Sequence, residues 1–354
     1  MRPLHLRRLA FLPSCLGCAL PLAAQTTVSL PCVADNTLYQ SATGDLSNGA
    51  GIGVFVGLSS SGLIRRGLVR FDVAAGLPAG AKVLAARLDL NVSNSPVAAA
   101  EPLFGHRLLQ SWGEGTSVAG AGGGNGGPAA TGDATWLHRF YTSQLWTTPG
   151  GDFVAVPSFT ATMPGLGAFS SVPSQAAAAD VQAWLDTPAS NFGWLLKGGE
   201  TLLQSTHRLD SRESTGLRPT LVVTYLQPGQ SGAWGTGCAG TFGSFTTSWL
   251  GAPLGGGTMQ SAQAAAPTPS VGAVFFALAI DPAGTPLLPG CAVWLPVSGL
   301  IPGPAFFTDA AGAATTPFAV PVGFPGQLVA CQAAVLAPTP LGFTAGNAAI
   351  TVLQ

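Results

Sequence analysis

Charged side chains are scarce in this sequence. Its 14 Lys and Arg and 15 Asp and Glu residues make up 8% of the chain, against a usual share of roughly 25%. The formal net charge is −1, so the chain lacks the basic excess that attracts a phosphate backbone. We therefore exclude nucleic acid as a partner.

Long apolar runs are also absent beyond the first 24 residues. The longest, Val271–Ile280, is about half the ~20 residues that a membrane-spanning helix needs. Mean hydropathy is nonetheless positive, at +0.40. The run predicts a buried strand, and the sequence predicts no membrane span.

Residues with common catalytic roles are few, and no H-E-x-x-H motif occurs. The segment closest to a nucleophile elbow, Gly115–Ala119, lacks the second glycine. Glu114 with Asp133 has the residue types of a glycosidase acid/base pair, and His138 with Tyr141 those of a lyase pair. Each of these residues also suits a turn or a strand. We expect a protein that is not an enzyme.

Residues 1–24 have the layout of a secretory signal peptide. Arg2, Arg7 and Arg8 precede the apolar stretch Leu9–Leu22, and two alanines then offer a cleavage site before residue 25. A lipoprotein signal ending at Cys18 is the alternative. We expect a secreted or cell-surface protein.

Four cysteines remain after residue 24: Cys32, Cys238, Cys291 and Cys331. An exported chain favours disulfides, and four cysteines allow three pairings, which the sequence leaves open. None of the four belongs to a C-x-x-C motif or has a histidine close by, so a zinc site is not expected. One or two disulfides are predicted.

Charge divides the chain into two domains. From Leu226 to the last residue there is no Lys or Arg, and the only acids are Asp281 and Asp309. Such a shift indicates two domains with different surfaces. We place the first domain at 25–226, a Gly/Gln/Ser-rich linker at 227–237 and the second domain at 238–354.

Both domains have the pattern of strands. In Ala81–Asn94 one parity is uniformly apolar, as on a sheet face that covers a core. Gln175–Asp186 is the one predicted helix, with Ser174 as N-cap and Pro188 after its end. The 48 glycines and 29 prolines suit the turns between short strands. The predicted fold is all-β, and the second domain is the smaller β-sandwich.

A series of strings resembles a known bacterial domain. In order they are DNTLY (Asp35–Tyr39), NGAGIGVFVG (Asn48–Gly57), RRGLVRFDV (Arg65–Val73), LPAGAKVLAARLDL (Leu77–Leu90), WGEGTS (Trp112–Ser117), DATWLHRFY (Asp133–Tyr141), WTTPGGDF (Trp146–Phe153), DVQAWLDTPASNFGWLL (Asp180–Leu196) and SRESTGLRPTLVVTY (Ser211–Tyr225). Together they resemble the DNRLRE domain over Thr27–Tyr225. The resemblance implies a jelly-roll β-sandwich related to carbohydrate-binding modules, and hence an extracellular polysaccharide as partner.

Two further features qualify the resemblance. In HRLDSRE (His207–Glu213), Leu209 stands where the family commonly carries an aromatic residue. The string TGCAG (Thr236–Gly240) and the Gly/Pro-rich tail resemble a C-terminal domain frequent on secreted planctomycete-type proteins, which implies no activity.

Arginine and tryptophan side chains are the candidate ligand-binding groups. Arginine forks suit acidic or hydroxylated sugars, and exposed tryptophan faces stack on sugar rings. Salt bridges between strands, and burial in a core, are the alternatives; for Trp184 and Trp194 we expect the core. The predicted ligand-binding residues are Arg65, Arg66, Trp112, Trp146, Arg208 and Arg212.

Acidic residues close to glycines suggest a metal site. Asp45, Glu114, Asp133 and Asp152 offer the hard oxygen ligands that calcium takes, although their spacing matches no EF-hand. We expect no other cofactor, with a structural calcium ion as the hypothesis for these four.

We expect a secreted module that binds an extracellular polysaccharide through surface Trp and Arg. A structural or adhesive protein of the cell surface is the alternative, and a polysaccharide lyase or hydrolase a weaker one. A groove lined by exposed Trp and Arg favours binding, whereas buried Trp and paired Arg favour the structural alternative.

Overall fold

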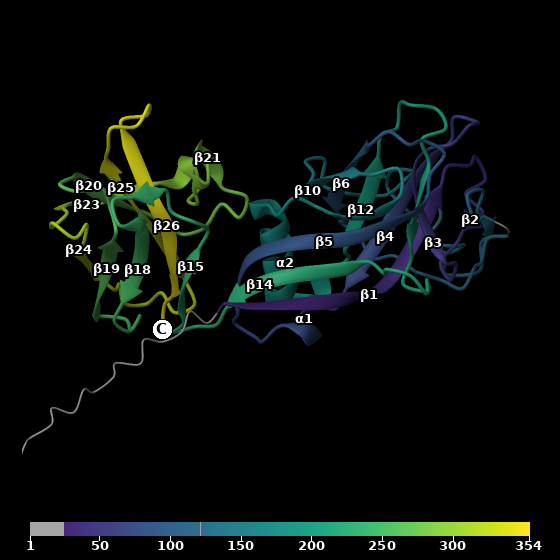
Figure 1. The fold of residues 1–354 in the computed structure, drawn as a ribbon. Helices are drawn as coiled ribbons and strands as arrows, with labels where there is room; N and C mark the ends of the chain where they lie inside the picture. Colours follow the sequence, from purple (N-terminus) through teal and green to yellow (C-terminus); the bar gives the residue numbers. More distant parts are fainter. Residues whose placement is uncertain (1–24, 121) are drawn as a thin grey trace, which may run out of the picture.

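A computed structural model describes residues 25–120 and 122–354. They form two β-rich units that lie side by side in Figure 1. The predicted all-β fold is confirmed. The predicted signal peptide, residues 1–24, lies outside the described residues.

The first unit extends from β1 to β14. Its strands are β1 (Thr26–Tyr39), β2 (Leu46–Ser47), β3 (Gly53–Leu58), β4 (Ile64–Phe71), β5 (Lys82–Asn94), β6 (Glu101–Arg107), β7 (Gly127–Pro128), β8 (His138–Phe140), β9 (Gln144–Leu145), β10 (Phe159–Met163), β11 (Gly167–Ser170), β12 (Trp194–Gly198), β13 (His207–Asp210) and β14 (Thr220–Leu226). Its helices are α1 (Val73–Gly76), α2 (Gln175–Asp186) and the 3-10 turn η1 (Pro188–Ser190).

Strand β1 closes the first unit. Its first half, Thr26–Pro31, pairs with β14, and its second half, Cys32–Tyr39, pairs with β4 after an irregularity in register. The order β1-β14-β5-β13-β3-β4 therefore returns to β1, while β12, β6 and β10 extend beyond β4. All these pairings are antiparallel. The predicted sandwich is thus joined along its edges into a barrel-like sheet.

Local sequence signals account for β5 and α2. In β5, Leu88, Leu90 and Val92 are buried and alternate with more exposed residues, as their pattern predicts. The Ser174 side chain accepts a hydrogen bond from the Ala177 N–H, which satisfies a free donor in the first turn of α2. The structure adds the single turn α1, which sequence did not predict. In the described part of the chain, no helix is long and apolar enough to cross a membrane.

The main core of the first unit lies between its sheets and α2. Trp184 of α2 and Trp194 of β12 are buried there, as predicted, with ring centroids 4.6 Å apart. Leu209 lies in the same core, so a bulkier aromatic at this position would face inward and would not stack on a ligand.

A second layer covers the outer face of β4 and β12. The long connection between β6 and β10 packs its aromatic residues over Leu68 and Leu195 of these strands. The aromatic residues of this layer include Trp112, Trp136 and Trp146. The connection is therefore part of the hydrophobic scaffold.

The second unit extends from β15 to β26. Its strands are β15 (Ser231–Trp234), β16 (Ala239–Gly240), β17 (Gly243–Ser244), β18 (Thr246–Leu250), β19 (Thr258–Ala264), β20 (Val271–Ala277), β21 (Thr285–Leu288), β22 (Cys291–Val293), β23 (Ile301–Phe307), β24 (Ala314–Ala319), β25 (Leu328–Leu336) and β26 (Phe343–Val352), with the 3-10 turn η2 (Val297–Gly299) between β22 and β23.

Two sheets form the second unit. The sheet β15-β26-β25-β20-β23 packs on the sheet β18-β19-β24 over a core that includes Trp249, Met259 and Val329. Residues Val271–Ala277 of the apolar run form β20, so the predicted strand is confirmed, but only Val274 and Ala277 of it are fully buried. The predicted linker 227–237 is wrong in part, because its residues 231–234 form β15 and pair with β26.

The two units contact each other directly. Leu84 of β5 and Leu226 of β14 belong to one buried cluster with residues of the second unit such as Ile280 and Ile350. The Gln175 side chain also donates to the Ile280 carbonyl at 2.9 Å. Apolar contact and the short connection after β14 both hold the units together.

One cysteine pair is bonded in the structure. Cys238 and Cys291, which are 53 positions apart in sequence, form a disulfide. Of the four cysteines that the structure describes, Cys32 and Cys331 are buried free thiols in different units. A second disulfide is therefore not formed.

We expect the double variant Cys238→Ser/Cys291→Ser to lower the free energy of unfolding by about 2–4 kcal/mol, because the cross-link restricts the unfolded chain. Chemical denaturation measures this change. Alkylation counts the free thiols of the denatured chain from which residues 1–24 have been removed. We expect two thiols to react without reductant and four after reduction. Four reactive thiols without reductant would contradict the pairing.

Candidate functional site

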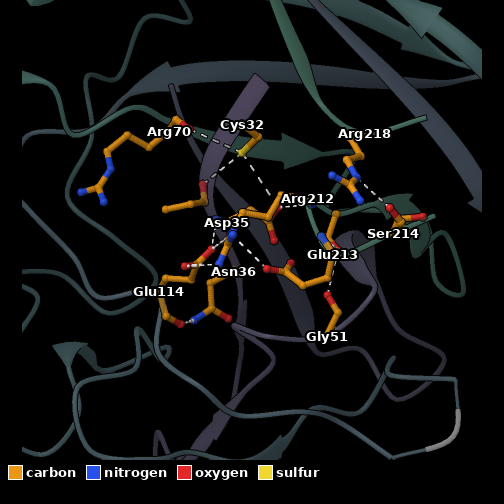
Figure 2. A network of polar contacts seen from close by, with 12 residues as sticks. Cys32, Asp35, Asn36, Gly51, Arg70, Glu114, Arg212, Glu213, Ser214 and Arg218 are labelled. Atoms are coloured by element: carbon orange, nitrogen blue, oxygen red, sulfur yellow. Dashed lines mark hydrogen bonds and ion pairs between the residues drawn. The ribbon is translucent and has the colours of Figure 1, made fainter. Parts of the chain in front are cut away.

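Three of the strings that carry the family resemblance meet in space. Asp35 lies on β1, Glu114 on the connection after β6, and Arg212 and Glu213 on the loop after β13. Figure 2 shows these side chains gathered in one polar network. We call Asp35, Glu114, Arg212 and Glu213 the ionic cluster.

The ionic cluster holds β1 where it passes from one sheet to the other. The Asp35 N–H donates to Glu114 Oε1 at 2.9 Å, and the Arg212 N–H donates to Asp35 Oδ2 at 2.7 Å. Asn36 adds bonds from its Nδ2 to the Glu114 carbonyl oxygen at 2.7 Å and to Ser47 Oγ at 2.9 Å. Backbone groups that the crossing would leave unpaired are thereby satisfied.

The Arg212 guanidinium is bound by carboxylates of the protein itself. Its Nε and Nη2 donate to Glu114 Oε1 and Oε2 at 2.5 and 2.8 Å, and its Nε lies 2.9 Å from Glu213 Oε1. These bonds raise the Arg212 pKa, mainly through Glu114. The predicted ligand-binding role of Arg212 is therefore not supported, since its fork is occupied within the protein.

Negative charge exceeds positive charge in the ionic cluster. Asp35 is 0% exposed, and its burial raises the pKa of the carboxyl to about 8, helped by the neighbouring Glu213 and Glu114 and opposed by bonds from Arg212. Burial also raises the Glu213 pKa. Asp35 Oδ1 and Glu213 Oε2 are buried without a hydrogen-bond partner among the described residues.

The predicted calcium ligands do not come together. Asp133 accepts the N–H groups of Thr116 and Ala130, and Asp152 accepts those of Thr147 and Thr148. Short acidic side chains beside glycines here bind loop backbone, which is their common role in turns. The hypothesis that all four residues hold calcium is wrong.

The remaining two predicted ligands differ from each other. Asp45 accepts from the Thr43 hydroxyl at 2.5 Å in a loop. Glu114 alone belongs to a group with metal-ligand geometry: in residues 25–120 and 122–354, the set found is Asp35, Glu114 and Glu213. Sequence reasoning missed Asp35 and Glu213 as ligands, although both lie in the quoted strings.

The predicted surface tryptophans are buried. Trp112 is 2% exposed and Trp146 is 4% exposed. Their indole N–H groups donate to the carbonyl oxygens of Phe192 and Thr135, at 2.8 and 3.0 Å. Both side chains cover the outer face of β4 and β12, so neither is available to stack on a sugar ring.

Arg65 and Arg66 are also part of the scaffold. Arg65 is 3% exposed, lies over the Tyr39 ring and donates to the Gly124 carbonyl at 3.0 Å. Arg66 forms a forked pair with Glu200 at 2.8 and 3.1 Å and lies 5.1 Å from the Trp136 ring centroid. The contacts of these two arginines therefore fit the alternative, a structural role in holding strands together, better than a ligand-binding surface.

Arg208 differs from the other predicted arginines because it lines an open hollow. It pairs across the sheet with Phe55 of β3 and Asn94 of β5, and directly paired residues lie on the same face. A register shift in β5 also brings Ser93 to Arg208, whose Nε donates to Ser93 Oγ at 3.0 Å. We call this feature the Arg208 hollow.

The surface of the Arg208 hollow is mostly apolar, with several polar side chains among its lining residues. Its volume is about 260 Å³, and a second hollow of about 440 Å³ adjoins it along Phe55 and Arg208. Its lining includes Phe55, Asn94, Asn125, Gln204, Thr206 and Arg208. Amides, a hydroxyl and a guanidinium offer hydrogen bonds to a hydroxyl-rich ligand. Sequence reasoning found Arg208 but not its neighbours, which come from separate segments.

We expect the free energy of unfolding, measured with EDTA present, to fall as the pH rises from about 4 through about 8. The pKa of Asp35 is near 8 in the folded state and roughly 4 in an unfolded chain, so the folded state binds this proton more tightly. Asp35→Asn keeps an oxygen that can accept from the Arg212 N–H. The substitution should therefore remove the part of the pH dependence of stability that comes from Asp35. Urea unfolding at pH 5 and pH 8 measures the difference.

The comparison between wild type and Asp35→Asn isolates Asp35. The raised pKa values of Glu213 and Asp180 act in the same direction but are present in both proteins. Equal pH dependence in wild type and Asp35→Asn would contradict the assignment.

Comparison with known proteins gives no relative from which a role could be transferred. No protein-family model matches the chain, and no curated protein is significantly similar to it. Support for a function therefore comes from the Arg208 hollow, the ionic cluster and the resemblance to the DNRLRE domain.

Proposed function

We propose that the chain is an exported, non-catalytic module that binds an extracellular polysaccharide at the Arg208 hollow. The observation that carries the proposal is the row Phe55, Arg208 and Asn94 on adjacent strands, with Gln204 and Asn125 at its rim. Such a row offers hydrogen-bond donors close together on one face, which suits sugar hydroxyl groups, whereas the Phe55 ring is buried and does not serve as a stacking surface.

The charge of the lining favours acidic sugars. Among the described residues that line the two hollows, Arg208 is charged and none is acidic. Its Nε is held by Ser93, which orients the guanidinium. Ile52 and Val118, exposed in the adjoining hollow, add apolar surface for the ring carbons of a sugar. The resemblance to the DNRLRE domain supports the same ligand class.

A structural or adhesive role is the second candidate, and a specific observation favours it. Trp112 and Trp146 are buried, and Arg66 and Arg212 are paired with glutamates. These residues therefore stabilise the fold and do not form a ligand surface. Under this candidate the Arg208 hollow binds no glycan.

Catalysis has less support. Asp133 is 0% exposed and holds backbone N–H groups, and Glu114 is paired with Arg212. His138 contacts the Tyr141 ring edge-on, with centroids 5.1 Å apart, and its Nδ1 lies 3.2 Å from Thr135 Oγ1. These groups have roles in packing that require no substrate.

We expect the purified chain to be retained on an acidic polysaccharide more strongly than on a neutral one. Because a hydrogen bond to a charged group contributes about 1.5–3 kcal/mol, Arg208→Ala should weaken retention by about tenfold or more. Affinity electrophoresis over a panel of neutral and acidic polysaccharides measures this change.

The matched control is Arg87→Ala. Arg87 is an exposed arginine on β5 that pairs with Asp89 and should leave retention unchanged. No retention on any polysaccharide, or equal retention of wild type and Arg208→Ala, would favour the structural candidate. A fall in the viscosity of the polysaccharide would show an enzyme instead.

A further inference from the structure

The ionic cluster has ligand atoms that the protein itself does not use. Asp35 Oδ1 and Glu213 Oε2 are buried and have no hydrogen-bond partner among the described residues. Burying such oxygens without a partner is costly, and buried polar atoms are nearly always paired with protein, water or an ion. We propose that Asp35, Glu114 and Glu213 bind one divalent cation, and that this cation is calcium.

The geometry fits one ion. One carboxylate oxygen from each of the three residues lies within 4.8 Å of the other two. Calcium takes oxygen ligands at roughly 2.3–2.6 Å, so two ligands on opposite sides of the ion lie about 4.6–5.2 Å apart. The three oxygens can therefore surround a common centre without a large rearrangement.

The orientation of Asp35 supports this arrangement. Its Oδ2 is held by the Arg212 N–H at 2.7 Å, which leaves Oδ1 as the free ligand atom. The carboxylate is 0% exposed, so bulk water does not solvate it. Figure 2 shows the Asp35, Glu114 and Glu213 side chains arranged around the Arg212 guanidinium.

The charges balance with a divalent ion. Three carboxylates facing one guanidinium carry a formal charge of −2, and a divalent cation brings the total to zero. The other groups at the cluster add no charge: Asn36 is an amide, and burial raises the Cys32 pKa so that its thiol stays neutral. Arg212 shares Glu114 with the proposed ion and keeps the acids in place.

The donor set selects the class of metal. All three ligands are carboxylates, which suit calcium, whereas zinc favours nitrogen and sulfur and magnesium demands a regular octahedron. The Glu114 side chain is 19% exposed and that of Glu213 is 21% exposed. Water can therefore complete the coordination, and the affinity should be that of extracellular sites, on the order of 10⁻⁴–10⁻³ M.

Calorimetry with calcium chloride tests the proposal on the purified, EDTA-treated and dialysed chain. The expected result is one saturable site and a Tm that rises with calcium concentration, with a weaker response to magnesium chloride. Asp35→Asn and Glu213→Gln should each weaken binding at least tenfold. Circular dichroism checks that both variants fold, and Asp45→Asn is the matched control that should bind as wild type does.

Two outcomes would overturn the proposal. The first is the absence of both a binding heat and a Tm shift at 10 mM calcium, and the second is calcium binding that survives Asp35→Asn and Glu213→Gln.

Discussion

The passage of β1 from one sheet to the other is the constraint on which the first unit depends. A single strand pairs with β14 and then with β4, so the closed sheet exists only while this strand stays in register on both sides. The crossing at Cys32–Ala34 disrupts the regular ladder directly before Asp35. Glu114 and Arg212 come from distant segments and form hydrogen bonds with Asp35 at this crossing. Closing the sheet therefore also brings these charged groups together.

The crossing of β1 also explains why the predicted surface tryptophans are buried. The connection that carries Glu114 to β1 also carries Trp112 and Trp146, which pack over the outer face of β4 and β12. Apolar burial there stabilises the connection, which in turn positions Glu114. One outer face is thereby covered, and the outer face of β3, β13 and β5 is where the Arg208 hollow opens.

Sequence could predict the elements whose signals are local. Ser174 and Pro188 bound α2, and the alternation in β5 marks its buried face. Gly113 and Gly115 beside Trp112 favour a loop, but whether a loop packs back on a sheet depends on residues far away in the sequence. The ionic cluster joins pairs 79 and 177 positions apart, so no local spacing could reveal it. Likewise, acids beside glycines predict turns and calcium loops equally well.

Strand β13 links the ionic cluster to the Arg208 hollow. Arg208 faces outward from this strand while Leu209 is buried beneath it, and the loop after it carries Arg212 and Glu213. The strand is short and is followed by a turn, so its position depends on what holds that turn. The Ser211 hydroxyl bonds to the Gly51 carbonyl at 2.8 Å, and the Arg212 N–H and guanidinium bond to Asp35 and Glu114 of the ionic cluster. The bonds of Arg212 to Asp35 and Glu114 therefore help to hold the end of β13, and with it the position of Arg208.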